Sequence, residues 1–270
     1  MGIYQLKTKK PLKRVQLEHS PNIHILVLIA THANTPFKKK TIENNHECLQ
    51  SSIYAKYTAD FIYIHSDECG QFHNTSPLLQ KNGCGTCEHH YIQNNLALLD
   101  SHKWLFAIDK GFDKEKYSHV ALLNDSFILL RPVPELFDFF VRENNMCGLL
   151  KSTEIQLHIQ SFCRCMPSNL ISQYVEYIEN CRNKVKDYKT NVYELEVKIC
   201  EYLKPTWLFD SPNNVNIHFN DHHMKHYICD LNYPCMKLKW AIQSGKLYPL
   251  ARDFLNQYNI NVQFKPFTEY

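Results

Sequence analysis

Short, continuous apolar segments constrain the fold of this chain more than any other feature. Residues 23–31 read IHILVLIAT, and the apolar residues follow one another without a regular polar alternation. Runs of this kind are typical of strands in a parallel sheet, because helices cover both faces of such a sheet. Residues 59–67, 117–130 and 146–152 are similarly apolar and are predicted to be further strands. We therefore expect a sheet that is largely parallel.

Helical segments are predicted between these strands. The first covers residues 35–54, with Pro36 near its start, where a helix tolerates proline. Residues 68–90 are expected to be a loop, and a helix over residues 91–108 then places three apolar residues on one face: Ile92, Leu96 and Leu99. Further helices are predicted at 133–144, about 168–183 and about 190–203, the last two with Ser168 and Thr190 as N-caps. This alternation indicates a layered α/β fold.

Composition limits the classes of function. The 270 residues suffice for one α/β domain after a locally basic tail at residues 1–20. The net charge is only +3, from 30 basic and 27 acidic residues, so we expect no nucleic-acid partner. No apolar run approaches the ~20 residues of a membrane span, and we expect a cytoplasmic protein. The 11 cysteines are scattered through mostly apolar segments, so we expect reduced thiols.

The segment CGTCEHH, residues 84–90, has the spacing of a zinc or redox motif. A structural zinc site needs a second pair of ligands at suitable spacing, and His89 and His90 follow Cys87 too closely to complete it unaided. A thioredoxin-like motif belongs after the first strand, whereas this segment follows the second. An ordinary glycine-containing loop is the favoured interpretation, and zinc at Cys84 and Cys87 stays an alternative. Walker, dinucleotide-binding and Gly-x-Ser-x-Gly motifs are absent.

Polar residues mark the ends of three predicted strands. The segments are THAN at 31–34, HSDE at 65–68 and NDS at 124–126. Ligands of open α/β sheets bind outside the carboxyl ends of the strands, where these segments gather. The sequence therefore predicts a site at this edge.

Asp125 is the predicted centre of that site. A carboxylate together with substrate phosphates and waters is a common way to hold Mg²⁺ or Mn²⁺, and such a cation stabilises a departing diphosphate. The position, at the end of a buried strand in mid-chain, is that of the Asp-x-Asp motif in GT-A glycosyltransferases. Without this context, NDS is a simple turn.

The order of motifs resembles that of glycosyltransferases related to the rhamnan synthesis F family. The matching segments are VALLNDSF, PVPELFDFF, CGLLKS and HIQSF, followed by NVYELEVKICEYL and YPCMKLKWA. The resemblance covers roughly residues 23–245. Its specificity comes from the combination of these segments and not from any single one. The loop NGCGTCEHH departs from the family pattern, because it has Glu88 where those relatives carry a Gly-Asp-type motif.

This resemblance implies a GT-A-like, Rossmann-type three-layer sandwich with a mostly parallel sheet and an irregular C-terminal segment. It implies one glycosyltransferase domain over residues 21–270, with a nucleotide-binding part at about 21–130 and an acceptor-side part at about 131–270. The implied reaction transfers a deoxyhexose such as L-rhamnose, with inversion, from a UDP- or dTDP-linked donor to a glycan acceptor. The implied cofactor is Mn²⁺ or Mg²⁺.

Each candidate residue receives a role on this basis. Asp125 is the metal or diphosphate ligand. Nucleotide-sugar contacts are expected from Thr31, His32, Ser66, Asp67, Asn124, Ser126, Gln160 and Ser161. His158 is the candidate general base, since its ordinary pKa lies near neutrality, and Glu154 is its rival if the segment is helical.

The C-terminal part supplies further candidates. The segment NIHFNDHHMKH at 216–226 offers late metal ligands, of which His218 and His222 are favoured over Asp221 and His223. Lys237 and Lys239 are candidates for neutralising the diphosphate. The main alternative function is a catalytically silent GT-A-like domain that binds a glycan or serves as a scaffold.

Overall fold

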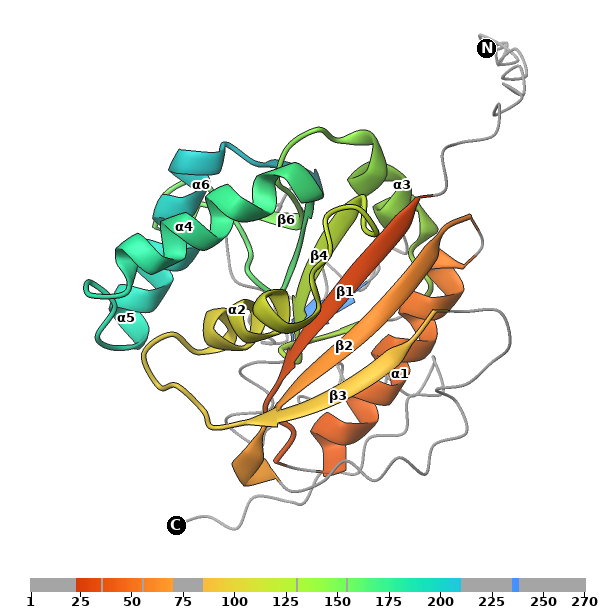
Figure 1. The fold of residues 1–270 in the computed structure, drawn as a ribbon, viewed down its shortest axis with the longest axis horizontal. Coiled ribbons are helices and arrows are strands. Elements are labelled where there is room, and N and C mark those ends of the chain that lie inside the picture. Colours follow the sequence, from red (N-terminus) through yellow and green to blue (C-terminus); the bar gives the residue numbers. More distant parts are fainter. Residues whose placement is uncertain are drawn as a thin grey trace, which may run out of the picture.

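A twisted sheet forms the centre of the molecule, and helices cover both of its faces (Figure 1). A computed structural model describes residues 23–34, 36–54, 56–69, 85–129, 131–153, 155–209 and 235–237. Within these residues the sheet has eight strands in the order β3-β2-β1-β4-β8-β6-β7, with β9 paired to β6. The arrangement is the layered α/β sandwich that the sequence predicts.

The first half of the sheet is parallel. Its strands are β1 (His24–Thr31), β2 (Thr58–Ser66), β3 (Cys87–Ile92) and β4 (His119–Asn124). Helix α1 (Pro36–Ile53) lies between β1 and β2 in the chain, and helix α2 (Asp100–Gly111) lies between β3 and β4. Because β1 pairs with both β2 and β4, its carboxyl end lies between the carboxyl ends of these two strands.

The second half of the sheet is mixed. Strand β8 (Cys163–Pro167) is antiparallel to β4 and to β6 (Cys147–Ser152), β7 (His158–Ile159) is antiparallel to β6, and β9 (Thr206–Phe209) is parallel to it. The helices are α3 (Pro134–Arg142), α4 (Ile171–Cys181), α5 (Tyr188–Asn191), the π-helical turn η4 (Val192–Lys198) and α6 (Ile199–Leu203). Short 3₁₀ turns are η1 (Asp67–Cys69) and η3 (Ser168–Leu170), and β5 (Phe127–Leu129) pairs with β10 (Cys235–Lys237).

The apolar core lies on both faces of the sheet, because successive side chains of a strand point to opposite faces. Ile25 and Val27 of β1 belong to the cluster that includes α1 and α3. Leu26 and Leu28 belong to the cluster that includes α2, α4 and α6. This two-sided burial explains why β1 is continuously apolar.

The strands predicted at 23–31, 59–67 and 146–152 are confirmed, with ends that differ by one residue. The predicted strand at 117–130 is divided into β4 and β5, because a turn at Asp125 and Ser126 separates them. The described part of the chain contains no helix that is long and apolar enough to cross a membrane.

The prediction for residues 68–108 is wrong in two places. Residues 87–92 form the edge strand β3, where a loop to residue 90 and the start of a helix were predicted, and the helix begins at Asp100 rather than at residue 91. Leu96 is 78% exposed and does not belong to a buried helix face. The Asn95 side chain accepts hydrogen bonds from the backbone of Ala97 and Leu98, so this segment forms a turn.

Two further features differ from the sequence-based expectations. Strand β8 is antiparallel and follows the HIQSF segment, where no strand was predicted. Ser168 does not cap a helix with its side chain but donates to the carbonyl of Tyr117. Thr190 is the third residue of a capping box in which Asp187 is the N-cap.

Candidate active site

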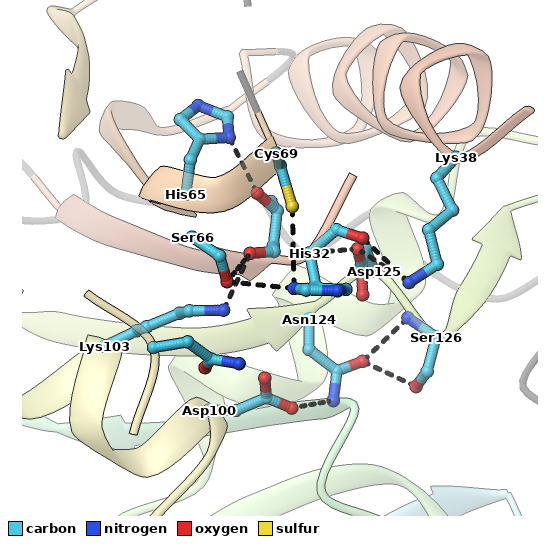
Figure 2. Close-up of polar contacts among 12 residues, drawn as sticks. His32, Lys38, His65, Ser66, Cys69, Asp100, Lys103, Asn124, Asp125 and Ser126 are labelled. Carbon is cyan, nitrogen blue, oxygen red and sulfur yellow. Dashed lines mark hydrogen bonds and ion pairs between the residues drawn. The ribbon is translucent and has the colours of Figure 1, made fainter. Parts of the chain in front are cut away.

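The candidate site lies where β1, β2 and β4 end. Ala30 is in register with Asn124, and Thr31 is in register with His65, so the residues after these positions emerge side by side. Figure 2 shows His32, Ser66, Asn124 and Asp125 gathered at this edge. The structure therefore brings together the three polar strand ends that the sequence predicts to meet.

Asp125 holds the chain segment that leaves β1. Its Oδ2 accepts a hydrogen bond of 2.7 Å from the backbone N–H of His32, and Lys38 Nζ of α1 lies 3.8 Å from the same oxygen. Lys38 also donates to the carbonyl oxygen of His32 at 2.8 Å. The carboxylate is 9% exposed, so these contacts form in partial isolation from water. Asp125 thus connects β4 to both β1 and α1.

The turn that presents Asp125 is shaped by its two neighbours. Asn124 Oδ1 accepts hydrogen bonds from the backbone N–H of Ser126 at 3.0 Å and from its hydroxyl at 2.6 Å. An asparagine side chain that bonds two residues ahead is a standard turn element. The NDS segment is therefore a turn, and the turn places a carboxylate at the site.

Asp100, at the start of α2, stabilises this turn through the side chain of Asn124. Its Oδ2 accepts a 2.8 Å hydrogen bond from Asn124 Nδ2, which fixes the orientation of the amide. Burial raises the pKa of Asp100 to about 6, although the Lys103 ammonium group opposes the shift. Asp100 was not predicted from the sequence as a site residue.

His32 and Ser66 form the rim of the site on the β2 side. His32 Nδ1 lies 3.1 Å from Ser66 Oγ, 3.4 Å from Glu68 Oε1 and 3.5 Å from Cys69 Sγ. Burial lowers the pKa of His32, and the nearby lysines lower it further. Asp67 is exposed and its carboxylate accepts from the backbone N–H of Glu68, and no contact of Asp67 with Asp125 is formed among the described residues.

Lys103 is the second residue that the sequence analysis missed. It is 2% exposed, and its Nζ donates to the carbonyl oxygen of Thr31 at 2.7 Å. A signal was present in the sequence, because Lys103 shares the buried side of α2 with Trp104 and Ala107. A lysine is almost never fully buried without a partner, so its place on an apolar helix face indicates a function.

Stacked imidazole rings from β2 and β3 contact the end of β1. Thr31 Oγ1 lies 2.7 Å from His65 Nδ1, and His65 Nε2 lies 2.9 Å from His89 Nδ1. The two imidazole rings are parallel within 1°. Burial lowers the pKa of His65 to about 3, and His89 also shifts downward for the same reason. These neutral rings hold Thr31 in place.

The geometry of β3 bears on only one part of the zinc alternative, the use of His89 and His90. Cys87 and His89 lie on one side of this strand, where Cys87 Sγ is 3.8 Å from His89 Nε2. His90 is the next residue of the strand, points to the opposite face and contacts Phe106. His89 and His90 therefore cannot join Cys87 in one site together. Cys84 lies outside the described residues. The eight described cysteines are free thiols, five of them buried.

The predicted acceptor-side residues are only partly brought to the site. The carbonyl of Phe162 accepts from the backbone N–H of Asn124, and Gln160 and Ser161 directly precede Phe162 in the chain. His158 lies in β7, is 4% exposed and pairs through Nδ1 with the carbonyl of Gln156. The residues just before it, 155–157, form a bend and not the helix that would place Glu154 and His158 on one face.

Several residues with predicted roles in the site lie outside the described residues: Glu154, His218, Asp221, His222, His223 and Lys239. Lys237 lies in β10, in register with Phe127, which places its backbone beside the strand that follows Asp125. The roles of these residues stay predictions.

Within the described residues, the donor set does not fit a divalent cation. No group of three or more His, Cys, Asp or Glu side chains there is arranged to hold a metal ion. Asp125 is the only predicted metal ligand among them, and its Oδ2 already contacts a backbone N–H and an ammonium group. Hard cations such as Mg²⁺ require several oxygen ligands. A cavity of about 10 Å³ beside Asp125 and Tyr63 is large enough for about one water molecule.

The fold is similar to that of solved glycosyltransferase structures. The glycosyltransferase GlyE of Streptococcus pneumoniae TIGR4 is 12% identical, with a TM-score of 0.57 over 89% of this chain and 61% of that one. Mouse xyloside xylosyltransferase 1 is 11% identical, with a TM-score of 0.46 over 80% of this chain and 97% of that one. Galactosyltransferase LgtC, solved with donor and acceptor sugar analogues, is 9% identical, with a TM-score of 0.42 over 67% of this chain and 72% of that one.

These likenesses concern the fold. The GlyE likeness shows that the chain has the GT-A-like α/β architecture expected from its sequence, and the chain spans 61% of the length of GlyE. No protein-family model and no curated protein sequence matches the chain, so the resemblance to the rhamnan synthesis F family is not confirmed.

Proposed function

We propose that this chain is a glycosyltransferase that moves a sugar from a nucleoside-diphosphate donor to a glycan acceptor. The observation that carries the proposal is the meeting of Asp125 with His32, Lys38 and Ser66 at the carboxyl edge of a GT-A-like sheet. Ligands of open α/β sheets bind at this edge. A carboxylate, two ammonium groups and backbone groups there suit a charged, hydroxyl-rich ligand.

The proposed reaction breaks the bond between the anomeric carbon and the diphosphate oxygen. The electron pair leaves with the diphosphate, and an acceptor hydroxyl oxygen forms the new glycosidic bond. The proton of that hydroxyl passes to a general base. His158 and Glu154 stay the candidates for this base. The negative charge that grows on the leaving diphosphate needs stabilisation by fixed positive groups.

The finer features of the reaction rest on the sequence resemblance. It supports a deoxyhexose such as L-rhamnose as the sugar, a UDP- or dTDP-linked donor, and inversion at the anomeric carbon. Thr31, His32, Ser66 and Asp67 are proposed for the nucleoside, and Lys237 for the diphosphate. Asn124 and Ser126 are proposed as hydrogen-bonding neighbours of Asp125, and Gln160 and Ser161 are proposed to face the sugar and acceptor. Mn²⁺ or Mg²⁺ at Asp125 is the sequence-based prediction, and no step is assigned to the cation here.

A ligand screen by thermal unfolding tests the proposal. The protein is heated with UDP, dTDP, GDP or CDP, once with Mn²⁺ and once with EDTA. A nucleotide at 100 times its Kd stabilises the folded state by about 2.7 kcal/mol, which raises the Tm of a domain of this size by at least about 2 °C. We expect such a rise in Tm with at least one of the four nucleotides, either with Mn²⁺ or with EDTA.

The matched variants are Asp125→Asn and Asp138→Asn. Asp138 is also paired with a lysine, Lys56, but belongs to α3 and not to the candidate site. The shift should shrink in Asp125→Asn and persist in Asp138→Asn. No shift with any nucleotide in either condition would favour the silent scaffold instead.

A further inference from the structure

Two lysines bind consecutive carbonyl groups at the end of β1. Lys103 Nζ of α2 donates to the Thr31 carbonyl at 2.7 Å, and Lys38 Nζ of α1 donates to the His32 carbonyl at 2.8 Å. The two lysines come from helices on opposite faces of the sheet. Figure 2 shows both ammonium groups at the edge that carries Asp125. Two positive charges therefore lie against one short stretch of backbone, residues 31–32.

Lys103 has more hydrogen-bond donors than acceptors around it. An ammonium group carries three N–H donors, and among the described residues Lys103 forms one hydrogen bond, to a neutral carbonyl. The residue is 2% exposed, so water does not readily supply the other acceptors. Burying a charge is costly unless it is paired. Burial lowers the pKa of Lys103, and Asp100 and Asp125 oppose this only through space.

Lys38 lies beside the same stretch of backbone as Lys103. Its side chain is 14% exposed, and its Nζ lies 3.8 Å from Asp125 Oδ2. Asp125 Oδ2 also accepts a hydrogen bond from the backbone N–H of His32. The same carboxylate therefore fixes Lys38 and the backbone segment that lies between the two lysines.

We propose that Lys38 and Lys103 form a cationic pair that binds the diphosphate of the donor, so that nucleoside diphosphates bind without a divalent cation. This inference rests on the proposed function of the site. A diphosphate carries several charged oxygens, which supply acceptors for the remaining donors of Lys103 and a second negative partner for Lys38. Asp125 then acts mainly by positioning Lys38 and the β1–α1 segment, which accounts for a donor set that, among the described residues, does not fit a metal ion.

Calorimetric titration in EDTA tests the pair directly. The probes are pyrophosphate, which reports on the diphosphate alone, and the nucleoside diphosphate with the largest thermal shift. The variants are Lys38→Gln, Lys103→Gln and Lys103→Arg. The control is Lys40→Gln, which removes an exposed lysine of the same helix α1 that pairs with Glu43. Folding of every variant is checked by circular dichroism.

We expect the parent protein and Lys40→Gln to bind both probes in EDTA with the same Kd. A hydrogen bond to a charged group contributes enough that Lys38→Gln and Lys103→Gln should each raise the Kd about tenfold or more. Lys103→Arg keeps the charge and should recover part of the loss. If Lys103→Gln does not fold, Lys38→Gln decides: a tenfold loss supports the pair, and an unchanged Kd overturns it.

Two other outcomes overturn the inference. One is binding that requires Mn²⁺ and disappears in EDTA, which leaves the proposed function intact and assigns the charge neutralisation to the metal. The other is binding in EDTA that neither lysine substitution changes. The absence of nucleotide binding in both conditions contradicts the proposed function itself, so the two failures are distinguishable.

Discussion

Asp60 and Asp125 are both buried carboxylates, and their neighbours give them different tasks. Asp60 lies near the amino end of β2 and contacts Lys116, Tyr117, the backbone of Thr86 and His24. These partners occupy its oxygens, so its role is structural. Asp125 lies at the opposite end of the sheet, with its contacts concentrated on one oxygen. Burial alone therefore does not identify a functional carboxylate; its place in the fold and its partners do.

Asp60 should make stability depend on pH in the acid range. Burial raises its pKa, but the hydrogen bonds from Lys116, Tyr117 and Thr86 prevail and lower it to about 2. A depressed carboxyl pKa contributes stability that is complete above the unfolded-state value, about 4, and is lost as the pH falls toward 2. The shift corresponds to about 2 kcal/mol.

Urea unfolding of the parent and Asp60→Asn between pH 2 and 7 measures this contribution. The difference in the free energy of unfolding should be largest at pH 7 and should shrink by about 2 kcal/mol toward pH 2. Asp138→Asn, which alters a more exposed ion pair, should show a much smaller pH-dependent difference. A pH-independent difference for Asp60→Asn would contradict the assignment.

At the scale of elements, the sequence predicts what local patterns determine and misses what tertiary contacts determine. Strands β1, β2 and β6 are predictable because burial on both faces leaves a continuous apolar run. Strand β3 is an edge strand whose residues CEHHYI are half-buried and polar, and its sequence therefore resembles a loop. Lys103 could have been found from its place on the apolar side of α2, whereas Lys38, whose side chain is 14% exposed, reaches the site only because α1 packs on the sheet.

Arg164 is another residue whose role depends on tertiary contacts, because it forms hydrogen bonds with η4. This arginine of β8 is 1% exposed, and its guanidinium donates to the carbonyls of Ile159, Leu195 and Glu196. It therefore ties the π-helical turn to the sheet. A buried arginine as the second residue of CRCMP is one reason that β8 does not resemble a strand in the sequence.

Replacing Arg164 should loosen this element. Arg164→Met removes the hydrogen bonds of a buried guanidinium to three carbonyls, which should lower the free energy of unfolding by about 3 kcal/mol. Hydrogen exchange should accelerate most at residues 192–203. Arg182→Met, which removes an exposed arginine paired with Glu179, should change stability by less than about 0.5 kcal/mol. Equal effects of the two substitutions would show that Arg164 does not hold η4.

At the scale of the whole molecule, the parallel half of the sheet builds the candidate site. The register of β1 with β2 and β4 places their ends together, so the meeting of residues 31–32, 66 and 124–125 follows from the topology. This part of the site could be predicted, because the ends of parallel strands share an edge. The positions of the proposed acceptor-side residues His158 and Gln160 could not, since they depend on the antiparallel strand β7 and on the loop between β7 and β8.

The most direct test of the central claim measures release of nucleoside diphosphate from sugar donors. The parent and Asp125→Asn are incubated with UDP- and dTDP-linked sugars, including dTDP-L-rhamnose, with EDTA or with Mn²⁺. The parent should release nucleotide from at least one donor, and Asp125→Asn should be slower by about 10²-fold, as expected for loss of a preorganised electrostatic contact. Release at the buffer rate by both proteins with every donor would contradict the claim.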